Sequence, residues 1–134
     1  MNILIADDYP ENRRFLYDLL IPFGSCDQAA NGLEAVDLVE ASLVEETPYD
    51  LILLDIMMPV MDGQSALQAI RALEVAYGVI GAKEAVIIMV TALDAPEAVT
   101  EAFYKGYCTD YITKPFTRLM LLEKLREYNL IPHE

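Results

Sequence analysis

The sequence is poor in the residues that build zinc sites and disulfide frameworks. Its 134 residues include no tryptophan, one histidine (His133) and two cysteines (Cys26 and Cys108). These residues form no cluster with the ligand spacing of a zinc site. We expect the two cysteines to be reduced and partly buried rather than joined in a disulfide.

Positive charge is also scarce. The chain has 9 Lys and Arg residues against 22 Asp and Glu residues, and its formal net charge is -13. Without a basic surface, we expect no direct binding to nucleic acid or to an anionic membrane. The acidic excess is compatible with cation binding or a basic partner, and equally with simple solubility.

Long apolar runs and leader signals are missing too. No run approaches the ~20 residues of a membrane-spanning helix, and the first residues lack a basic region followed by an apolar one. We therefore expect no membrane insertion and a cytoplasmic location. Hydrophobic residues make up 54% of the chain, which suffices for the core of a single domain, expected over residues 1–134.

Short apolar runs alternate with helical patterns along the chain. Strands are predicted at 2–6, 51–54, 85–90 and 111–113, with a weaker one at 25–30. The runs LILL and AVIIMV are apolar at every position, as is typical of strands covered on both faces. Apolar residues at helical spacing mark five helices: Phe15, Leu19 and Leu20; Leu33, Val36 and Val39; Leu67, Ile70 and Leu73; Val99, Ala102 and Phe103; and Leu119, Leu122 and Leu125. This β–α order predicts a parallel sheet with helices on both faces.

Individual residues mark several helix ends. Pro10 suits a first helical turn, Asn31 and Asp62 are candidate N-caps, and Gly106 follows a helix end.

Polar side chains follow four of the predicted strands where each strand ends. Asp7 and Asp8 follow the first strand, Asp55 follows LILL, Thr91 follows VIIMV and Lys114 follows the fifth strand. The carboxyl ends of parallel strands share one edge, where ligands of open α/β sheets bind. If the first and third predicted strands are neighbours in the sheet, three carboxylates, a hydroxyl and an ammonium group converge there.

Such a cluster predicts phosphoryl chemistry. Three carboxylates without a cation repel one another, and Mg²⁺ suits oxygen ligands that it shares with phosphate and water. No twelve-residue loop with alternating oxygen ligands supports calcium. Lys114 supplies a point charge for phosphate and Thr91 a neutral donor. A carboxylate nucleophile, a metal and a cation together compose a phosphoryl-transfer site.

Four stretches carry a family resemblance: ILIADD, YDLILLDIMMPVMDG, VIIMVTA and DYITKPF, which extend over residues 3–116. In combination they resemble the response-regulator receiver domains of two-component signalling, of the chemotaxis-regulator type. The resemblance implies a flavodoxin-like, doubly wound (βα)5 fold with strand order 2-1-3-4-5. It implies a phosphoacceptor switch rather than a turnover enzyme, which receives a phosphoryl group from a sensor histidine kinase or phosphotransfer protein and then binds a downstream protein target.

The resemblance also implies residue roles at the metal. Asp55 would accept the phosphoryl group as an acyl phosphate. Asp8 would bind Mg²⁺ directly, Asp7 would help through water, and Asp55 with the backbone carbonyl of Met57 would complete the protein ligands.

Further roles concern the switch. Thr91 and Lys114 would contact the phosphoryl oxygens, and Tyr111 would turn inward when Thr91 moves. The bond before Pro115 would be cis. The output face would lie near the fourth helix, the fifth strand and the fifth helix.

Simpler interpretations remain open for single residues. Asp7 or Asp8 is also suited to capping the first helix, Thr91 to a strand by β-propensity, and Tyr111 to core packing.

Two stretches depart from the family pattern. GYCTDY places Tyr107 where a small residue is usual, and ALEVAYGVIGAKEA is a long connection that is either a tolerated surface extension or a docking element.

Two other functions compete with the receiver. A phosphatase of the haloacid-dehalogenase type also forms an aspartyl phosphate, but its D-x-D-x-[TV] motif after the first strand is missing. A degenerate receiver that only binds a partner would not need the complete set of Asp7, Asp8, Asp55, Thr91 and Lys114.

Overall fold

The computed structural model describes residues 1–92 and 107–133. Within these ranges, five parallel strands form one sheet in the predicted order β2-β1-β3-β4-β5. The strands are β1 (Asn2–Ala6), β2 (Ser25–Ala29), β3 (Leu51–Asp55), β4 (Val86–Ala92) and β5 (Asp110–Lys114). The helices are α1 (Pro10–Leu20), α2 (Gly32–Val44), α3 (Gly63–Ala76) and α5 (Arg118–Glu127), with 3-10 turns η1 (Ile21–Phe23) and η2 (Gly81–Lys83). The helix predicted around Val99, Ala102 and Phe103, with Gly106 after it, lies outside the described residues.

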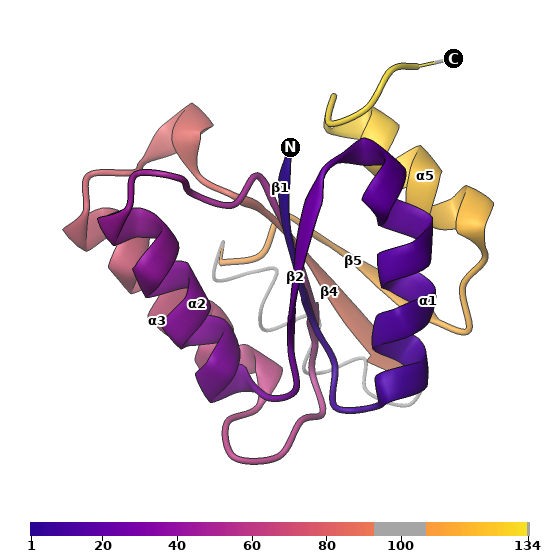
Figure 1. The fold of residues 1–134 in the computed structure, drawn as a ribbon, viewed down its shortest axis with the longest axis horizontal. Helices are drawn as coiled ribbons and strands as arrows, with labels where there is room; N and C mark the ends of the chain where they lie inside the picture. Colours follow the sequence, from indigo (N-terminus) through magenta and orange to yellow (C-terminus); the bar gives the residue numbers. More distant parts are fainter. Residues whose placement is uncertain (93–106, 134) are drawn as a thin grey trace.

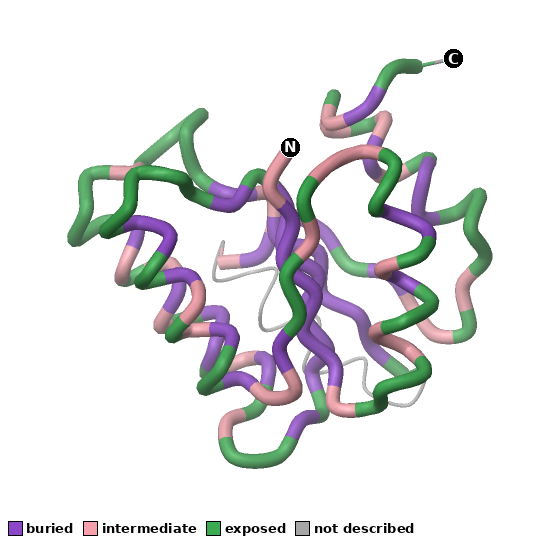
Figure 2. Tube along the Cα trace, in the orientation of Figure 1, coloured by how far each residue is buried: buried purple, intermediate pink, exposed green. Residues whose placement is uncertain are grey.

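Helices cover both faces of the sheet. α1 and α5 lie on one side, and α2 and α3 lie on the other (Figure 1). The inner strands are therefore apolar at nearly every position, and β3 is buried throughout (Figure 2). β2 is an edge strand and is mostly exposed, which explains its polar sequence SCDQA and its weak pattern.

Successive strand residues enter two separate cores, because side chains alternate between the faces of a sheet. Leu4, Ile52 and Ile87 pack on the side of α2 and α3. Their chain neighbours Ile3 and Leu53 pack on the side of α1 and α5. Both cores are continuous across the inner strands, so the strand ends are held in fixed positions relative to one another.

The predicted packing faces of three helices are partly wrong. Phe15, Leu33 and Leu119 are 49%, 44% and 60% exposed. α2 instead buries Ala35 on the sheet, and α5 buries Leu121. Apolar residues extend around more of each helix than the face that contacts the sheet, so spacing alone does not select the buried side.

The predicted starts of three helices are confirmed. Pro10 occupies the first turn of α1. The side chain of Asn31 accepts a hydrogen bond from the Glu34 N–H at the start of α2, and that of Asp62 accepts one from the Ser65 N–H at the start of α3. These acceptors satisfy N–H groups that have no partner inside the helix.

Cys26 and Cys108 are free, as predicted. Across the described ranges, none of the helices combines the length and the apolar character needed to cross a bilayer.

A buried ion pair anchors the long connection between α3 and β4. Arg71 Nη1 lies 2.7 Å from Glu74 Oε1 and donates to the Ala85 carbonyl at 2.9 Å. Glu74 Oε2 in turn accepts the Ala85 N–H at 2.8 Å. Arg71 Nε also donates to the Tyr107 carbonyl at 2.6 Å. The two stretches that depart from the family pattern are thus joined through one arginine.

Candidate functional site

Three carboxylates meet at the carboxyl edge of the sheet. β1 pairs with β3 so that Ala6 lies opposite Leu54, which places Asp7 beside Asp55. One carboxylate oxygen from each of Asp7, Asp8 and Asp55 lies within 4.8 Å of the others. The predicted meeting of the three carboxylates is present.

Asp55 is the last residue of β3 and is only 5% exposed. Its Oδ1 accepts the Met57 N–H at 3.1 Å, and its Oδ2 accepts a bond from Lys114 Nζ at 2.8 Å. Burial raises the pKa of Asp55, the charge of Asp7 adds to this rise, and the bonds from Lys114 and Met57 offset it only in part.

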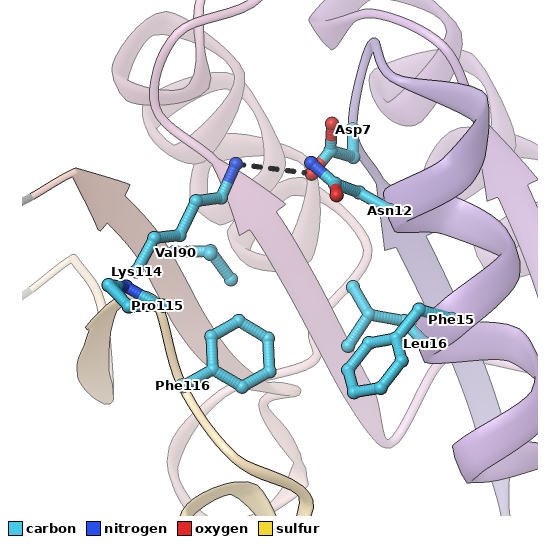
Figure 3. A pocket seen from close by; sticks show the side chains of 8 residues that line it. All are labelled: Asp7, Asn12, Phe15, Leu16, Val90, Lys114, Pro115 and Phe116. Carbon is cyan, nitrogen blue, oxygen red and sulfur yellow. Dashed lines mark hydrogen bonds and ion pairs between the residues drawn. The ribbon is translucent and has the colours of Figure 1, made fainter.

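Lys114 reaches the cluster from the end of β5. Its Nζ lies 3.4 Å from Asp7 Oδ2 (Figure 3). This contact is in addition to its bond with Asp55. Burial by itself lowers the pKa of Lys114, but the hydrogen bonds and charges of Asp55 and Asp7 outweigh it and raise that pKa. The ammonium group is therefore charged at neutral pH. The predicted cis bond between Lys114 and Pro115 is present.

The neighbouring residues Asp7 and Asp8 differ in how their acceptors are filled. Asp7 is buried, its Oδ1 accepts the Tyr9 N–H at 2.9 Å, and its main-chain carbonyl accepts a bond from Arg13 at 2.7 Å. Asp8 Oδ1 is buried and has no hydrogen-bond partner among the described residues. A buried acceptor without a donor is costly. This open oxygen, beside two further carboxylates, fits a hard cation such as Mg²⁺.

Two close backbone contacts fix the segment after Asp55. A Cβ at Gly63 would lie 2.1 Å from the Asp55 carbonyl oxygen, and one at Gly32 would lie 2.3 Å from the Met61 carbonyl oxygen. The starts of α3 and α2 therefore approach this segment as only glycine permits. Gly32 N–H also donates to the Met61 carbonyl at 2.9 Å. The backbone around the carboxylate cluster is held from two sides.

Three further predicted residues are Thr91 on β4, Tyr111 on β5 and Met57 in the segment after Asp55. Thr91 is buried next to Val90, which pairs with Asp55, and its hydroxyl donates to the Ala92 carbonyl at 3.2 Å. Tyr111 lies near the start of β5 and is 41% exposed. The Met57 side chain is exposed. The geometry thus unites Asp7, Asp8, Asp55 and Lys114, while the roles of the carbonyl of Met57 and of the side chains of Thr91 and Tyr111 stay predictions.

The sequence patterns missed a pocket of about 450 Å³ beside the cluster. Asn12 lies on its wall close to Asp7, and Phe15, Leu16 and Phe116 form apolar walls (Figure 3). The rings of Phe15 and Phe116 have their centroids 6.2 Å apart. Asn12 and Leu16 are four residues apart and so share one face of α1, which was the available signal for Asn12.

Comparison with known proteins identifies sequence relatives. Residues 3–126 match the family described as response regulator receiver domain. The chain is 35% identical over 127 residues to chemotaxis protein CheY-3 of Vibrio cholerae, which covers 93% of this chain and 88% of that protein. It is 34% identical over 122 residues to hybrid signal transduction histidine kinase I of Dictyostelium discoideum. That match covers 90% of this chain but only 7% of the kinase, so the chain spans a small part of this relative.

Two solved structures have the same arrangement of elements. One is the receiver domain of Ssk1 from Saccharomyces cerevisiae in a co-crystal with the histidine phosphotransfer protein Ypd1. Its TM-score is 0.78 at 32% identity, and the match covers 96% of this chain and 88% of that one. The other is the receiver domain of a sensor histidine kinase from Pseudomonas aeruginosa with magnesium coordinated in its active-site cleft. Its TM-score is 0.75 at 31% identity, with 95% of both chains covered.

Proposed function

The chain belongs to the response-regulator receiver family of two-component signalling, and from this premise we propose that Asp55 is the residue that accepts the phosphoryl group. One observation carries the proposal: three carboxylates lie within 4.8 Å of one another, and Lys114 bonds the one at the end of β3. This is an arrangement suited to holding a highly charged group and a cation together.

Asp8, Asp7 and Asp55 would hold Mg²⁺, with the Met57 carbonyl as a further ligand. When bound, Mg²⁺ would neutralise charge on the phosphoryl oxygens and lower repulsion between the reacting anions. The unpartnered Oδ1 of Asp8 supports this assignment. The magnesium in the cleft of the Pseudomonas aeruginosa receiver, which is 31% identical, supports it as well.

The transfer itself needs one nucleophile and one leaving group. A carboxylate oxygen of Asp55 attacks the phosphorus of a phosphohistidine, an O–P bond forms, and the N–P bond breaks. The histidine nitrogen leaves with the bonding electron pair and takes up a proton from solvent. Lys114 holds the phosphoryl oxygens during this exchange, since its ammonium group already bonds Asp55 Oδ2. Water later hydrolyses the acyl phosphate, which resets the protein slowly.

Phosphorylation would change the charge balance of the site. A phosphoryl group brings about -1.5 to -2 charges and new acceptor oxygens. Lys114 and the hydroxyl of Thr91 would turn toward these oxygens, and the Thr91 hydroxyl would give up its bond to the Ala92 carbonyl. Tyr111 would follow into the space that Thr91 leaves, which alters the face around β5 and α5. A shift of this kind needs only a few kcal/mol of differential binding.

The phosphoryl donor would be a sensor histidine kinase or a phosphotransfer protein, as in the yeast complex that contains Ypd1. A downstream protein target would bind the altered face. We place the exchange in the cytoplasm, where reducing conditions suit the two free cysteines.

Incubation with acetyl phosphate and Mg²⁺ tests the proposal. Intact mass spectrometry of the wild type should show the addition of one phosphoryl group, and Asp55→Asn should show none. Asp110→Asn is a matched control, because Asp110 is also a buried aspartate bonded to a lysine, and it should be phosphorylated like the wild type.

The same experiment separates the competing functions. Continuous release of phosphate from acetyl phosphate without an accumulated adduct would favour a phosphatase. No adduct at all, in a protein that still binds Mg²⁺, would favour a module that only binds a partner.

A further inference from the structure

Negative charge is distributed unevenly along the chain. Between Arg14 and Arg71 there is no Lys, Arg or His, while the same stretch has ten acidic residues: Asp18, Asp27, Glu34, Asp37, Glu40, Glu45, Glu46, Asp50, Asp55 and Asp62. Half of these residues lie on α2 or directly after it, and that half is exposed. One helix therefore presents a concentrated negative surface.

Within residues 1–92 and 107–133, three of these carboxylates have no compensating cation. Asp37, Glu40 and Glu45 take part in no ion pair with any other described residue. The last turn of α2 has no basic residue, and Glu45 and Glu46 follow its end. Because the carboxyl end of a helix carries partial negative charge, acidic side chains are disfavoured there. A positively charged partner would relieve this repulsion.

The same helix borders an open groove of about 480 Å³, here called the α2–α3 groove. It is lined by Asp37, Glu40, Ala41, Val44, Glu45 and Tyr77. α2 and α3 lie side by side along it (Figure 1), and exposed residues recur along α2 (Figure 2). Val44 is 62% exposed and Tyr77 is 45% exposed. The groove thus combines apolar side chains with an acidic rim.

The α2–α3 groove is separate from the carboxylate cluster. The first residue of α2, Gly32, bonds the segment that follows Asp55. Val44 ends the same helix of 13 residues, which corresponds to a length of about 20 Å. A partner in the groove therefore leaves the carboxylate cluster accessible.

We propose that the α2–α3 groove docks a basic amphipathic helix of a partner protein. Residues 37, 40, 41 and 44 are spaced i, i+3, i+4 and i+7, so they form one continuous stripe on α2. An apolar side chain of the partner would pack between Val44 and Tyr77. Lys or Arg one turn before and after it would face Asp37, Glu40 and Glu45. Charge complementarity selects this partner, because nucleic acid and anionic lipid are repelled by the acidic rim.

A pair of synthetic helical peptides tests the proposal. One has leucines at i and i+4 flanked by lysines, and its twin has glutamates in place of the lysines. Fluorescence anisotropy should show salt-sensitive binding of the basic peptide and none of the acidic twin. Amide NMR shifts on titration should gather on α2 and on the end of α3.

Charge reversal supplies the matched controls. Glu40→Lys combined with Glu45→Lys should lower the affinity for the basic peptide by at least about tenfold. Glu11→Lys combined with Glu123→Lys makes the same change in net charge at exposed sites elsewhere and should leave binding nearly unchanged. Both double variants should accept phosphoryl groups from acetyl phosphate like the wild type, so failure here is distinguishable from failure of the phosphoacceptor assignment.

Three results would overturn the proposal. If both double variants lowered the affinity for the basic peptide equally, the peptide would be attracted to net charge alone. If the basic peptide did not bind, a basic amphipathic helix would be excluded as the partner. Concentration-dependent dimerisation that Val44→Ser and Tyr77→Ala abolish, seen by sedimentation, would assign the groove to a second copy of the chain.

Discussion

Two buried aspartates of one sheet, Asp55 and Asp110, show how a candidate reactive site differs from a structural one. They are 5% and 7% exposed. Each accepts a hydrogen bond from a lysine Nζ, Asp55 from Lys114 at 2.8 Å and Asp110 from Lys124 at 2.9 Å. Their pKa values nevertheless move in opposite directions, upward for Asp55 and downward for Asp110.

The donors around Asp110 explain its behaviour. Burial alone would raise the pKa of Asp110, but bonds from Lys124, from the Tyr128 hydroxyl at 2.7 Å and from the Tyr111 N–H at 2.7 Å lower it. The acceptors of this carboxylate are filled by the protein itself. Its hydrogen bonds therefore connect β5 to α5, and the carboxylate needs no bound cation to balance its charge.

Around Asp55 the balance is reversed. Asp7 crowds it with a like charge, Lys114 is shared between the two carboxylates, and Asp8 keeps a buried oxygen without a partner among the described residues. Burial is common to both clusters. An excess of carboxylates over donors is what marks the cluster that would bind Mg²⁺ and react.

The largest expected difference is in the phosphorylation rates of variants at Lys114 and Lys124. Lys114→Met should lower the rate of phosphorylation by acetyl phosphate about 10²–10³-fold, because the charge that stabilises the transferring group is lost. Lys124→Met, the matched control, should stay within about twofold of the wild type, since distant sites act independently. Initial rates from intact mass spectra measure both. A similar loss in the two variants would break the distinction between the clusters.

Magnesium should stabilise the protein through only one cluster. At a concentration about 100 times its dissociation constant, Mg²⁺ should raise the free energy of unfolding of the wild type by about 2.7 kcal/mol. Asp8→Asn should lose most of this gain, whereas Asp110→Asn should keep it. Urea unfolding with and without MgCl₂ measures the effect. Full stabilisation of Asp8→Asn would place the ion elsewhere.

Without magnesium, removal of each charge should have opposite effects on stability. Asp110→Asn should lower the free energy of unfolding by about 1–3 kcal/mol, because its buried donors lose a charged acceptor. Asp55→Asn should raise it at neutral pH, because a disfavoured buried charge is removed. Urea unfolding in the presence of EDTA measures both. Destabilisation by Asp55→Asn would mean that Lys114 fully compensates its charge.

The smallest effect is a difference in pH dependence. The pKa of Asp110 is lowered from 3.8 by folding, so its contribution to stability is present above that value and disappears as the pH falls through the folded-state pKa. The pKa of Asp55 is raised from 3.8, so its contribution is present below that value and disappears as the pH rises through the folded-state pKa. We therefore expect two opposite trends as the pH is lowered from about 6 to about 3. The free energy of unfolding of the wild type should fall relative to that of Asp110→Asn, and it should rise relative to that of Asp55→Asn. Parallel slopes would contradict the opposite shifts.

The strand-end pattern predicted the Asp55 cluster but not the Asp110 cluster. Strands buried on both faces give uninterrupted apolar runs, so the charged residue that ends each run is visible in the sequence. The chemotaxis-regulator resemblance supplied the strand order, which makes β1 and β3 neighbours and brings Asp7 to Asp55. Asp110 begins its strand. Its partner Lys124 lies on α5 and its partner Tyr128 directly after that helix, at positions that no local pattern distinguishes.

Tertiary packing also decided what the apolar spacing left open. Leu33 and Leu119 match a helical period yet face solvent, because the sheet contacts a different side of each helix. The Arg71–Glu74 pair looks like an ordinary surface pair at i and i+3, and only the folded connection to β4 buries it. Contacts of this kind depend on residues brought together from distant parts of the chain.

Locating the phosphoryl group tests the central claim most directly. After reaction with acetyl phosphate and Mg²⁺, borohydride converts an acyl-phosphorylated aspartate to homoserine, which peptide mass spectrometry identifies. We predict homoserine at position 55 and none at 7, 8 or 110. Modification at any of those three positions with Asp55 intact would contradict the account.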